Sequence, residues 1–410
     1  MSNKKALFIG FVWPEPKTTA AGHRMVQLLA SFKAQHYQVI FASTAQPTAY
    51  SANLNKFGIK TAQIQLNHNS FDDFIKNLGP AIVVFDRFMI EEQFGWRVAQ
   101  YAPQALRILN TEDLHSLRNT REDCHKKGEE FTADKWRANA MAKREIASIY
   151  RSDLTLLISP TETELLKTEF CIPEDLLLTL PFMVEAVAYE KNQELPSFGE
   201  RKDFMFIGNG KHAPNVDAIK FLKTAIWPLI RKKLPKSNLN IYGAYLPQQI
   251  TEMHKPNEGF YVHGWLENLD RTLQLTRINL APIRFGAGLK GKVIDGVRNG
   301  TPTVTTSIGA EGISDFLNSY DDPNLFAQKA ILLYSNKTDW LKAQDGQFKM
   351  LATQFAKEKL VPILFQKIDA LKQSLQEHRN KNFIGTLLQH QTMASTKFMS
   401  KWIAEKNKKN

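Results

Sequence analysis

The chain has few cysteines and no long apolar run. Its two cysteines, Cys124 and Cys171, stand far apart and form no metal-ligand spacing, so they indicate little beyond agreement with a reducing cytoplasm. No apolar stretch is long enough to cross a bilayer. The apolar segment 6–13 follows two lysines, but it is short and has no convincing cleavage site, so we expect a buried strand rather than a signal peptide.

Common signatures of nucleotide and nucleic-acid binding are also missing. The pattern Gly-x-x-x-x-Gly-Lys-Ser/Thr does not occur, which argues against a P-loop, and the first expected strand is not followed by Gly-x-Gly-x-x-Gly. There is no zinc spacing, no RNA-binding aromatic signature and no recognisable helix-turn-helix. The net charge of +12 is therefore weak evidence for nucleic acid, and we expect no such partner. Anionic lipid surfaces and phosphorylated substrates explain the same excess.

Strand and helix patterns alternate twice along the 410 residues. The first series starts with a strand at 7–12, a helix at 22–35 and a strand at 37–42. A polar stretch then breaks the pattern before a second series restarts with a strand at 203–208 and a helix at about 215–234. This order predicts an α/β fold with two facing Rossmann-like parallel-sheet domains and a C-terminal helical tail. The expected parts are a first domain at 1–190, a linker at 191–203, a second domain at 204–355 and C-terminal helices at 356–410.

The segment 281–312 combines a glycine loop with several cations. An expected strand ends in a loop with Gly286 and Gly288, which let the backbone approach a ligand, and a helix is expected to begin near Leu289. Asp295, expected on the first turn of that helix, can accept hydrogen bonds from ribose hydroxyls. Positive charge for phosphate comes from Arg284, Lys290 and Lys292. We interpret the segment as a diphosphate-and-ribose site, with an ordinary packing turn as the alternative.

These residues resemble the GT-B glycosyltransferases, most closely the retaining family 4 group. The resemblance is strongest across residues 204–313 and weaker before them. The segments that carry it are Arg284-Phe-Gly-Ala-Gly-Leu-Lys-Gly-Lys-Val-Ile-Asp295, the turns 300–302 and 309–312, Phe206-Ile-Gly-Asn with Pro214-Asn215, Val262-His-Gly-Trp265 and Ala20-Ala-Gly-His-Arg24.

The resemblance implies a transferase whose second domain binds a nucleotide-diphosphate sugar and whose first domain binds the acceptor. It implies transfer with retention, no metal and no cofactor, to a glycan or lipid-linked acceptor in polysaccharide or glycolipid biosynthesis. Cations in the loop and the lack of an Asp-x-Asp arrangement agree with a metal-free site. The implied donor-binding residues are Gly22, Gly208, Asn209, Lys211, Arg284, Gly286, Gly288, Lys290, Lys292, Asp295 and Glu311.

The sequence departs from the family pattern at three positions. Ala287 occupies the place of the first acid of the Glu-x₇-Glu pair, while Asp295 matches the second, and Asn209 and Asn215 replace a usual Arg and Lys. Phosphate neutralisation should then shift to the cations of the loop, with Lys211 as a helper. A non-catalytic nucleotide-sugar binder is the first alternative, and a nucleotide-sugar epimerase is the second.

Two groups in the first domain have two interpretations each. Gly22 either lets the backbone approach the donor phosphates or is a plain N-cap glycine. Asp113 and His115, our candidate catalytic residues, follow a buried strand and could orient an acceptor hydroxyl. Alternatively, Glu112 and Asp113 cap the helix that follows.

The last forty residues are basic and carry an apolar stripe. Eight Lys and Arg face two Glu between residues 371 and 410. Apolar residues recur at helical spacing from Phe383 to Ile403. We expect the segment 355–375 to return to the first domain. The end of the tail either docks on the body of the protein or lies on an anionic membrane, which would place a cytoplasmic enzyme peripherally at the inner face of the membrane.

Overall fold

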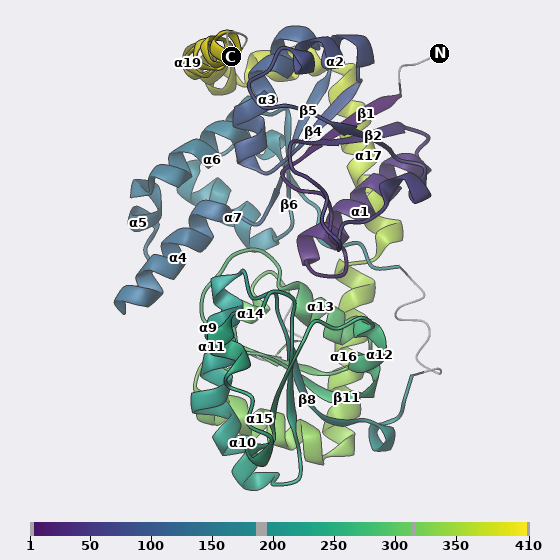
Figure 1. Ribbon diagram of the computed structural model, residues 1–410, viewed down its shortest axis with the longest axis vertical. Coiled ribbons are helices and arrows are strands. Elements are labelled where there is room, and N and C mark those ends of the chain that lie inside the picture. Colours follow the sequence, from purple (N-terminus) through teal and green to yellow (C-terminus); the bar gives the residue numbers. More distant parts are fainter. Residues whose placement is uncertain (1–3, 186–194, 314–316, 318, 408–410) are drawn as a thin grey trace. The chain divides into compact units, whose positions relative to one another are not determined.

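The computed structural model describes residues 4–185, 195–313, 317 and 319–407 (Figure 1). Contacts divide the chain into two compact units. The first contains Met1–Leu117, Thr132–Leu180 and Val361–Asn410, and the second contains Arg118–Phe131 and Pro181–Leu360. The linker expected at 191–203 lies partly outside the described residues.

The first unit is built on a parallel sheet whose described strands lie in the order β3-β2-β1-β4-β5-β6-β7. The chain order reverses between β1 and β4, which makes the carboxyl ends of these strands the usual ligand-binding edge of such a sheet. The strands are β1 (Lys5–Gly10), β2 (Gln38–Ser43), β3 (Lys60–Gln63), β4 (Ile82–Asp86), β5 (Leu106–Glu112), β6 (Leu154–Leu157) and β7 (Leu177–Thr179).

Helices cover both faces of this sheet, so its central strands β4 and β5 are buried along their whole length and largely apolar before their carboxyl ends. In Figure 1, α1 and α17 lie on one side of the sheet and α3 and α6 on the other. The helices that precede the second unit's sheet are α1 (Ala20–Ala34), α2 (Ser70–Leu78), α3 (Phe88–Tyr101), α4 (His115–Lys127), α5 (Ala133–Ala138), α6 (Ala140–Arg151) and α7 (Pro160–Phe170). Short 3₁₀ turns lie at Leu54–Phe57 and Glu174–Leu176.

The C-terminal helices pack within the first unit from Val361 onward. They are α17 (Lys357–Gln373), α18 (Leu375–Lys381) and α19 (Phe383–Asn407). Phe365 of α17 meets Phe32 of α1 edge to face, with ring centroids 5.0 Å apart. Arg379 of α18 donates two hydrogen bonds of 2.7 Å to the buried carboxylate of Asp153. Burial alone would raise the pKa of Asp153, but the adjacent Arg107 and Arg379 hold it below its usual value.

The second unit contains a smaller parallel sheet with the described order β10-β9-β8-β11-β12. The strands are β8 (Lys202–Ile207), β9 (Leu239–Tyr242), β10 (Phe260–Gly264), β11 (Thr276–Ala281) and β12 (Thr303–Thr305). The helices are α9 (Ala213–Phe221), α10 (Trp227–Lys233), α11 (Gln248–Thr251), α12 (Leu269–Leu275), α13 (Gly291–Arg298), α14 (Ser307–Ala310), α15 (Pro323–Ser335) and α16 (Lys337–Gln354). Two further 3₁₀ turns lie at Phe198–Glu200 and Pro256–Glu258.

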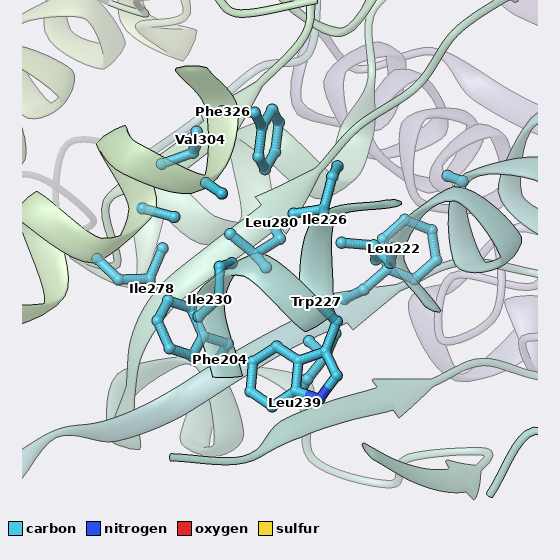
Figure 2. Packing of buried hydrophobic residues seen from close by; sticks show 14 of the residues in the cluster. Phe204, Leu222, Ile226, Trp227, Ile230, Leu239, Ile278, Leu280, Val304 and Phe326 are labelled. Carbon is cyan, nitrogen blue, oxygen red and sulfur yellow. The ribbon is translucent and has the colours of Figure 1, made fainter. Parts of the chain in front are cut away.

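The core of the second unit lies between the sheet and the helices α9, α10 and α15. Figure 2 shows Trp227 beside Phe204 and Leu239, with Ile278 and Leu280 of β11 in the same cluster. The expected single helix at 215–234 is interrupted by a π-helical turn at Leu222–Ile226. Pro228 explains the interruption, since it has no N–H for the helical ladder and its ring displaces the preceding turn.

The predicted fold class is confirmed by the two parallel sheets, their flanking helices and the C-terminal helical segment. One local prediction was wrong. Helix α13 begins at Gly291 with Lys290 as its N-cap, two residues after the expected start near Leu289. Asp295 is its fifth residue and lies on the second turn, not on the first as expected.

Candidate functional site

The glycine loop of the second unit leaves the carboxyl end of β11 and leads into α13. Gly286 has φ 145° and Gly288 has φ 64°, both in the region that L side chains rarely adopt. The loop therefore requires glycine at these two positions. Lys290 closes the loop from inside: its buried Nζ donates to the carbonyl oxygens of Ala287 at 3.2 Å and Gly288 at 2.6 Å.

Lys292 lies on the first turn of α13, and its ammonium group is buried beside the loop. Its Nζ donates a 2.8 Å hydrogen bond to Oδ1 of Asn215 on α9. Burial, together with the nearby charge of Lys290, lowers the pKa of Lys292 to about 8, while Asp295 acts in the opposite direction. No carboxylate of the described residues forms an ion pair with Lys292. A buried cation without a counterion is costly, and a bound anion would remove that cost.

The segment after β8 contributes the residues that contact Lys292 from α9 and the loop before it. Asn215 donates from Nδ2 to the carbonyl oxygen of Asn209 at 2.9 Å, which holds the amide with its oxygen toward Lys292. A Cβ atom on Gly208 would lie 2.7 Å from the Asn215 side chain, so glycine is needed there for close packing. Lys211 is exposed, and its Nζ lies 3.7 Å from the ring centroid of Tyr245.

The remaining predicted cation of the loop, Arg284, is engaged elsewhere in the second unit. Its guanidinium donates to both oxygens of Asp217, at 2.9 and 2.5 Å, and stacks over the Phe221 ring. Asp295 lies 3.2 Å from Nε of Arg298. Of the three cations predicted to neutralise phosphate, the structure thus places Lys290 and Lys292 together and Arg284 in a separate ion pair.

Glu311, predicted as a donor ligand, is held by an arginine that the sequence reasoning missed. Arg121, in the segment of α4 that belongs to the second unit, donates two hydrogen bonds of 2.7 Å to the two Glu311 oxygens. The same guanidinium donates to the carbonyl oxygen of Gly286 at 2.9 Å. Arg121 therefore ties the Glu311 loop to the glycine loop. The sequence signal for it was its position six residues after the candidate residue His115, on the same expected helix.

We expect Arg121→Met to destabilise the chain by about 1–3 kcal/mol, because the half-buried Glu311 carboxylate loses its partner. The Arg121→Met/Glu311→Gln double variant should lose less than the sum of the two single variants, with a coupling of at least about 1 kcal/mol. Urea unfolding of the four proteins in the cycle measures this. Additive losses would show that the two side chains act independently.

In the first unit, Gly22 lies on the first turn of α1 and is tightly packed. The N-cap is Thr19, whose hydroxyl accepts the Gly22 N–H at 3.0 Å, so the interpretation of Gly22 as the N-cap residue was wrong. A Cβ on Gly22 would lie 2.5 Å from backbone atoms of Glu15. The glycine is therefore required for the contact between α1 and the loop before it.

The two candidate catalytic residues of the first unit lie together. Nε2 of His115 is 3.6 Å from Oδ1 of Asp113, and the imidazole meets the Phe88 ring edge to face at 5.9 Å. The turn that carries them is held by buried acids from two other helices. Glu145 of α6 accepts hydrogen bonds from the backbone N–H of His115 and Ser116, and Glu162 of α7 accepts that of Leu114. Burial raises the pKa of Glu145 to about 7.

A buried polar cluster lies at the ends of β4 and β5. Asn110 donates to Glu112 at 2.7 Å and to Asp86 at 3.4 Å, and Arg24 donates to Asn110 at 3.4 Å. Glu112 has φ 60°, a strained value for a residue other than glycine, and burial raises its pKa to about 7. The cluster includes Glu112, the residue directly before the Asp113–His115 turn. The sequence indicated Arg24 and Glu112 separately but not that they meet, because the members of the cluster come from three separate elements.

Neither a metal-binding cluster nor a membrane-spanning helix is found among the described residues. No group of three or more His, Cys, Asp or Glu side chains in the described ranges is arranged to hold a metal ion. No described helix combines the length and apolar character needed to cross a membrane.

Comparison with known proteins supplies independent information about the chain. Residues 201–336 match the family described as glycosyl transferases group 1, a range that contains the glycine loop, Lys292 and Glu311. No curated protein matches the sequence.

Solved structures share the fold at low sequence identity. Sucrose-phosphate synthase from Thermosynechococcus elongatus is 13% identical, with a TM-score of 0.65 over 90% of this chain and 99% of its own. A glycosyltransferase from Rickettsia africae is 11% identical, with a TM-score of 0.62 over 89% and 98%. HepE from Anabaena, solved with UDP and glucose, is 11% identical, with a TM-score of 0.62 over 89% and 99%.

The matched range is that of a transferase family, and these neighbours share the fold. The resemblance indicated by the sequence motifs is therefore confirmed: residues 201–336 match the group 1 glycosyltransferases, and the chain has the GT-B fold of the glycosyltransferases.

Proposed function

We propose that this protein transfers a sugar from a nucleotide-diphosphate donor to a glycan or lipid-linked acceptor, with retention and without a metal or other cofactor. The observation that carries the proposal is the buried ammonium of Lys292, which has an amide rather than a carboxylate as its hydrogen-bond partner. Support comes from the group 1 match over the same unit and from HepE, a neighbour of this fold that was solved with UDP-glucose.

The donor diphosphate is assigned to Lys292 and the first N–H groups of α13. The helix begins at Gly291, directly after the loop, so its free N–H groups and positive dipole end add to the lysine charge. An anion there removes the unfavourable burial of the ammonium and keeps it protonated. As the sugar–phosphate bond breaks, the same charge stabilises the leaving diphosphate, which takes the place of a divalent cation in this proposal.

The contacts to the ribose and to the donor sugar are assigned to two carboxylates, Asp295 and Glu311. Asp295, one turn after Lys292 on α13, is the proposed partner of the ribose hydroxyls, for which it would exchange its contact with Arg298. Glu311 is the proposed partner of the donor sugar, held in position by Arg121. Lys290, which is bonded to its own loop carbonyls, is assigned to loop closure rather than to phosphate.

Acceptor chemistry is assigned to the first unit. We infer that His115, next to Asp113 and on a turn held by buried carboxylates, orients the acceptor hydroxyl and accepts its proton. An imidazole beside a carboxylate is suited to this role near neutral pH.

The alternative is a nucleotide-sugar binder without transferase activity. It is favoured by one observation, the buried methyl group of Ala287 where the family has an acid. In that case the diphosphate site would be intact while the contacts that activate the sugar would be missing.

Calorimetry against UDP-, GDP- and ADP-sugars, followed by donor hydrolysis assays, separates the two functions. We expect one nucleotide class to bind and its sugar to be released slowly in the absence of acceptor. His115→Ala should retain nucleotide affinity and lose at least about 100-fold in the rate of sugar release. Binding without release or transfer under any acceptor would support the binder instead, and binding of none of the three would refute both.

A further inference from the structure

The C-terminal helix α19 presents an apolar face to solvent along the first unit. Its exposed large side chains occur in two groups, with Phe383, Ile384 and Leu387 near its start and Phe398, Met399 and Trp402 near its end. At ~100° per residue these six positions fall within an arc of roughly 160°. Phe383, Phe398 and Trp402 are 68%, 67% and 61% exposed. We infer that this face docks on an anionic lipid surface.

The orientation of the helix is fixed by contacts on its opposite side. Ser400 accepts a 3.0 Å hydrogen bond from the buried Arg97 of α3, and Gln389 accepts one of 2.5 Å from Arg107. Near the start of the helix, a Cβ on Gly385 would lie 2.1 Å from the carbonyl oxygen of Tyr150 on α6. The helix packs against α3 and α6 (Figure 1). These contacts hold α19 on the first unit with its apolar face outward.

The charge around this face is positive. Lys401 and Lys406 are exposed and lie toward the two margins of the apolar arc, where long side chains can place their ammonium groups beside lipid headgroups. Lys406 also lies over the Trp402 ring, with Nζ 5.3 Å from its centroid. The sequence after Lys406 adds Lys408 and Lys409, while Glu405 is the sole acid between residues 378 and 410.

This charge distinguishes an anionic lipid surface from a second copy of the chain. Two copies that joined through α19 would bring lysine-rich ends into the same apolar contact, which costs energy because like charges repel. In an anionic bilayer, the aromatic side chains can insert below the headgroups while the lysines contact the negatively charged headgroups. The docking face therefore fits a peripheral contact at which the protein lies on a membrane surface.

Vesicle co-sedimentation of the full chain without nucleotide tests the inference. We expect binding to vesicles of phosphatidylglycerol and phosphatidylcholine in equal parts, weak binding to phosphatidylcholine alone, and loss of binding as salt rises. Phe398→Ser/Trp402→Ser and Lys401→Glu/Lys406→Glu should each weaken binding to the mixed vesicles at least about tenfold. Leu325→Ser/Leu332→Ser, which changes two exposed residues of α15 in the second unit, is the matched control and should bind normally.

The outcomes separate the possible occupants of the face. Thermal melting should show that the exposed substitutions leave the chain folded. No binding to mixed vesicles, or equal binding by both tail variants and the unaltered chain, overturns the inference. A concentration-dependent dimer that Phe398→Ser/Trp402→Ser abolishes, without vesicle binding, assigns the face to a second copy. Donor hydrolysis in solution should be unchanged in the tail variants, so this inference and the proposed function can fail separately.

Discussion

Lys292→Met is expected to lower the affinity for the nucleotide diphosphate by roughly 10- to 150-fold, the range for losing a hydrogen bond to a charged group. The ammonium is buried between the glycine loop and Asn215, and a diphosphate is the anion that its position predicts. Methionine keeps the length and apolar stem of the side chain, so the change removes the charge with little change in volume. Isothermal titration calorimetry at pH 7 measures the effect.

Affinity should also depend on pH in a way that identifies this lysine. Burial lowers the pKa of Lys292 to about 8, so the unliganded chain loses this proton as pH rises through 8. The anion requires the protonated form, and nucleotide affinity should therefore fall above pH 8 in the unaltered chain but not in Lys292→Met. Lys236→Met, which removes one exposed charge from the same unit, is the control and should leave affinity unchanged.

Burial of the Lys292 ammonium group should also make the unfolding free energy depend on pH. Its pKa is near 8 in the folded chain and 10.5 when exposed, so the cost of burying the charge is fully present below pH 8 and disappears as pH rises to 10.5. The unfolding free energy should rise across that window by about 3 kcal/mol more in the unaltered chain than in Lys292→Met. Equal pH profiles in urea unfolding, or full nucleotide affinity in Lys292→Met, would remove Lys292 from the site.

Arg201→Met is expected to lower the unfolding free energy of the second unit by about 3–5 kcal/mol. Arg201 is fully buried and has backbone carbonyls, not a carboxylate, as its main partners. Burial lowers its pKa to about 10. Its acceptors are Pro196 O at 2.9 Å, Thr301 Oγ1 at 2.9 Å, Asn299 O at 3.2 Å, Leu273 O at 3.4 Å and Thr276 O at 3.5 Å.

The large effect follows from what these acceptors do. Four of the five, all but Pro196 O, lie at or just after the C-terminal ends of α12 and α13, where helix carbonyls have no partner within the helix and a cation is favourable. Without the guanidinium, several buried oxygens would lose their donors and α13, which carries Lys292, would lose its support. Urea unfolding against Lys202→Met, an exposed neighbour on β8, measures the cost. A loss below about 1 kcal/mol would show that water replaces the guanidinium.

Most elements of the sheets could be predicted because they depend on near neighbours in the sequence. The expected strand at 203–208 and the observed β8 (Lys202–Ile207) differ by one residue, and the strand expected at 7–12 is β1 (Lys5–Gly10). The errors in helix bounds came from interactions that the hydrophobic periodicity of the sequence does not reveal. Pro228 perturbed the turn before it, and a loop closed by Lys290 delayed the start of α13 by two residues.

The candidate site was only partly predictable, for the same reason. The glycines and cations of the loop stand close together in the sequence, so their residue types alone indicated a site for an anion. Asn215 stood in the sequence as a substitution that weakened the family pattern, yet in the structure it is the partner that orients Lys292. Glu145 and Glu162 gave no sequence signal, because they act on Asp113–His115 from helices about 30 and 48 residues away.

The sequence by itself determined the strand and helix periods, the two left-handed glycines, the basic cluster and the apolar stripe of the tail, since each is a property of residues within a few turns of one another. Tertiary structure alone decided which of these groups meet. Lys292 and Asn215 are 77 positions apart, Arg121 and Glu311 are 190 apart, and Arg379 and Asp153 are 226 apart. Such pairs depend on the order of the strands and on which face of each helix is buried, and both are set by the packing of the whole unit.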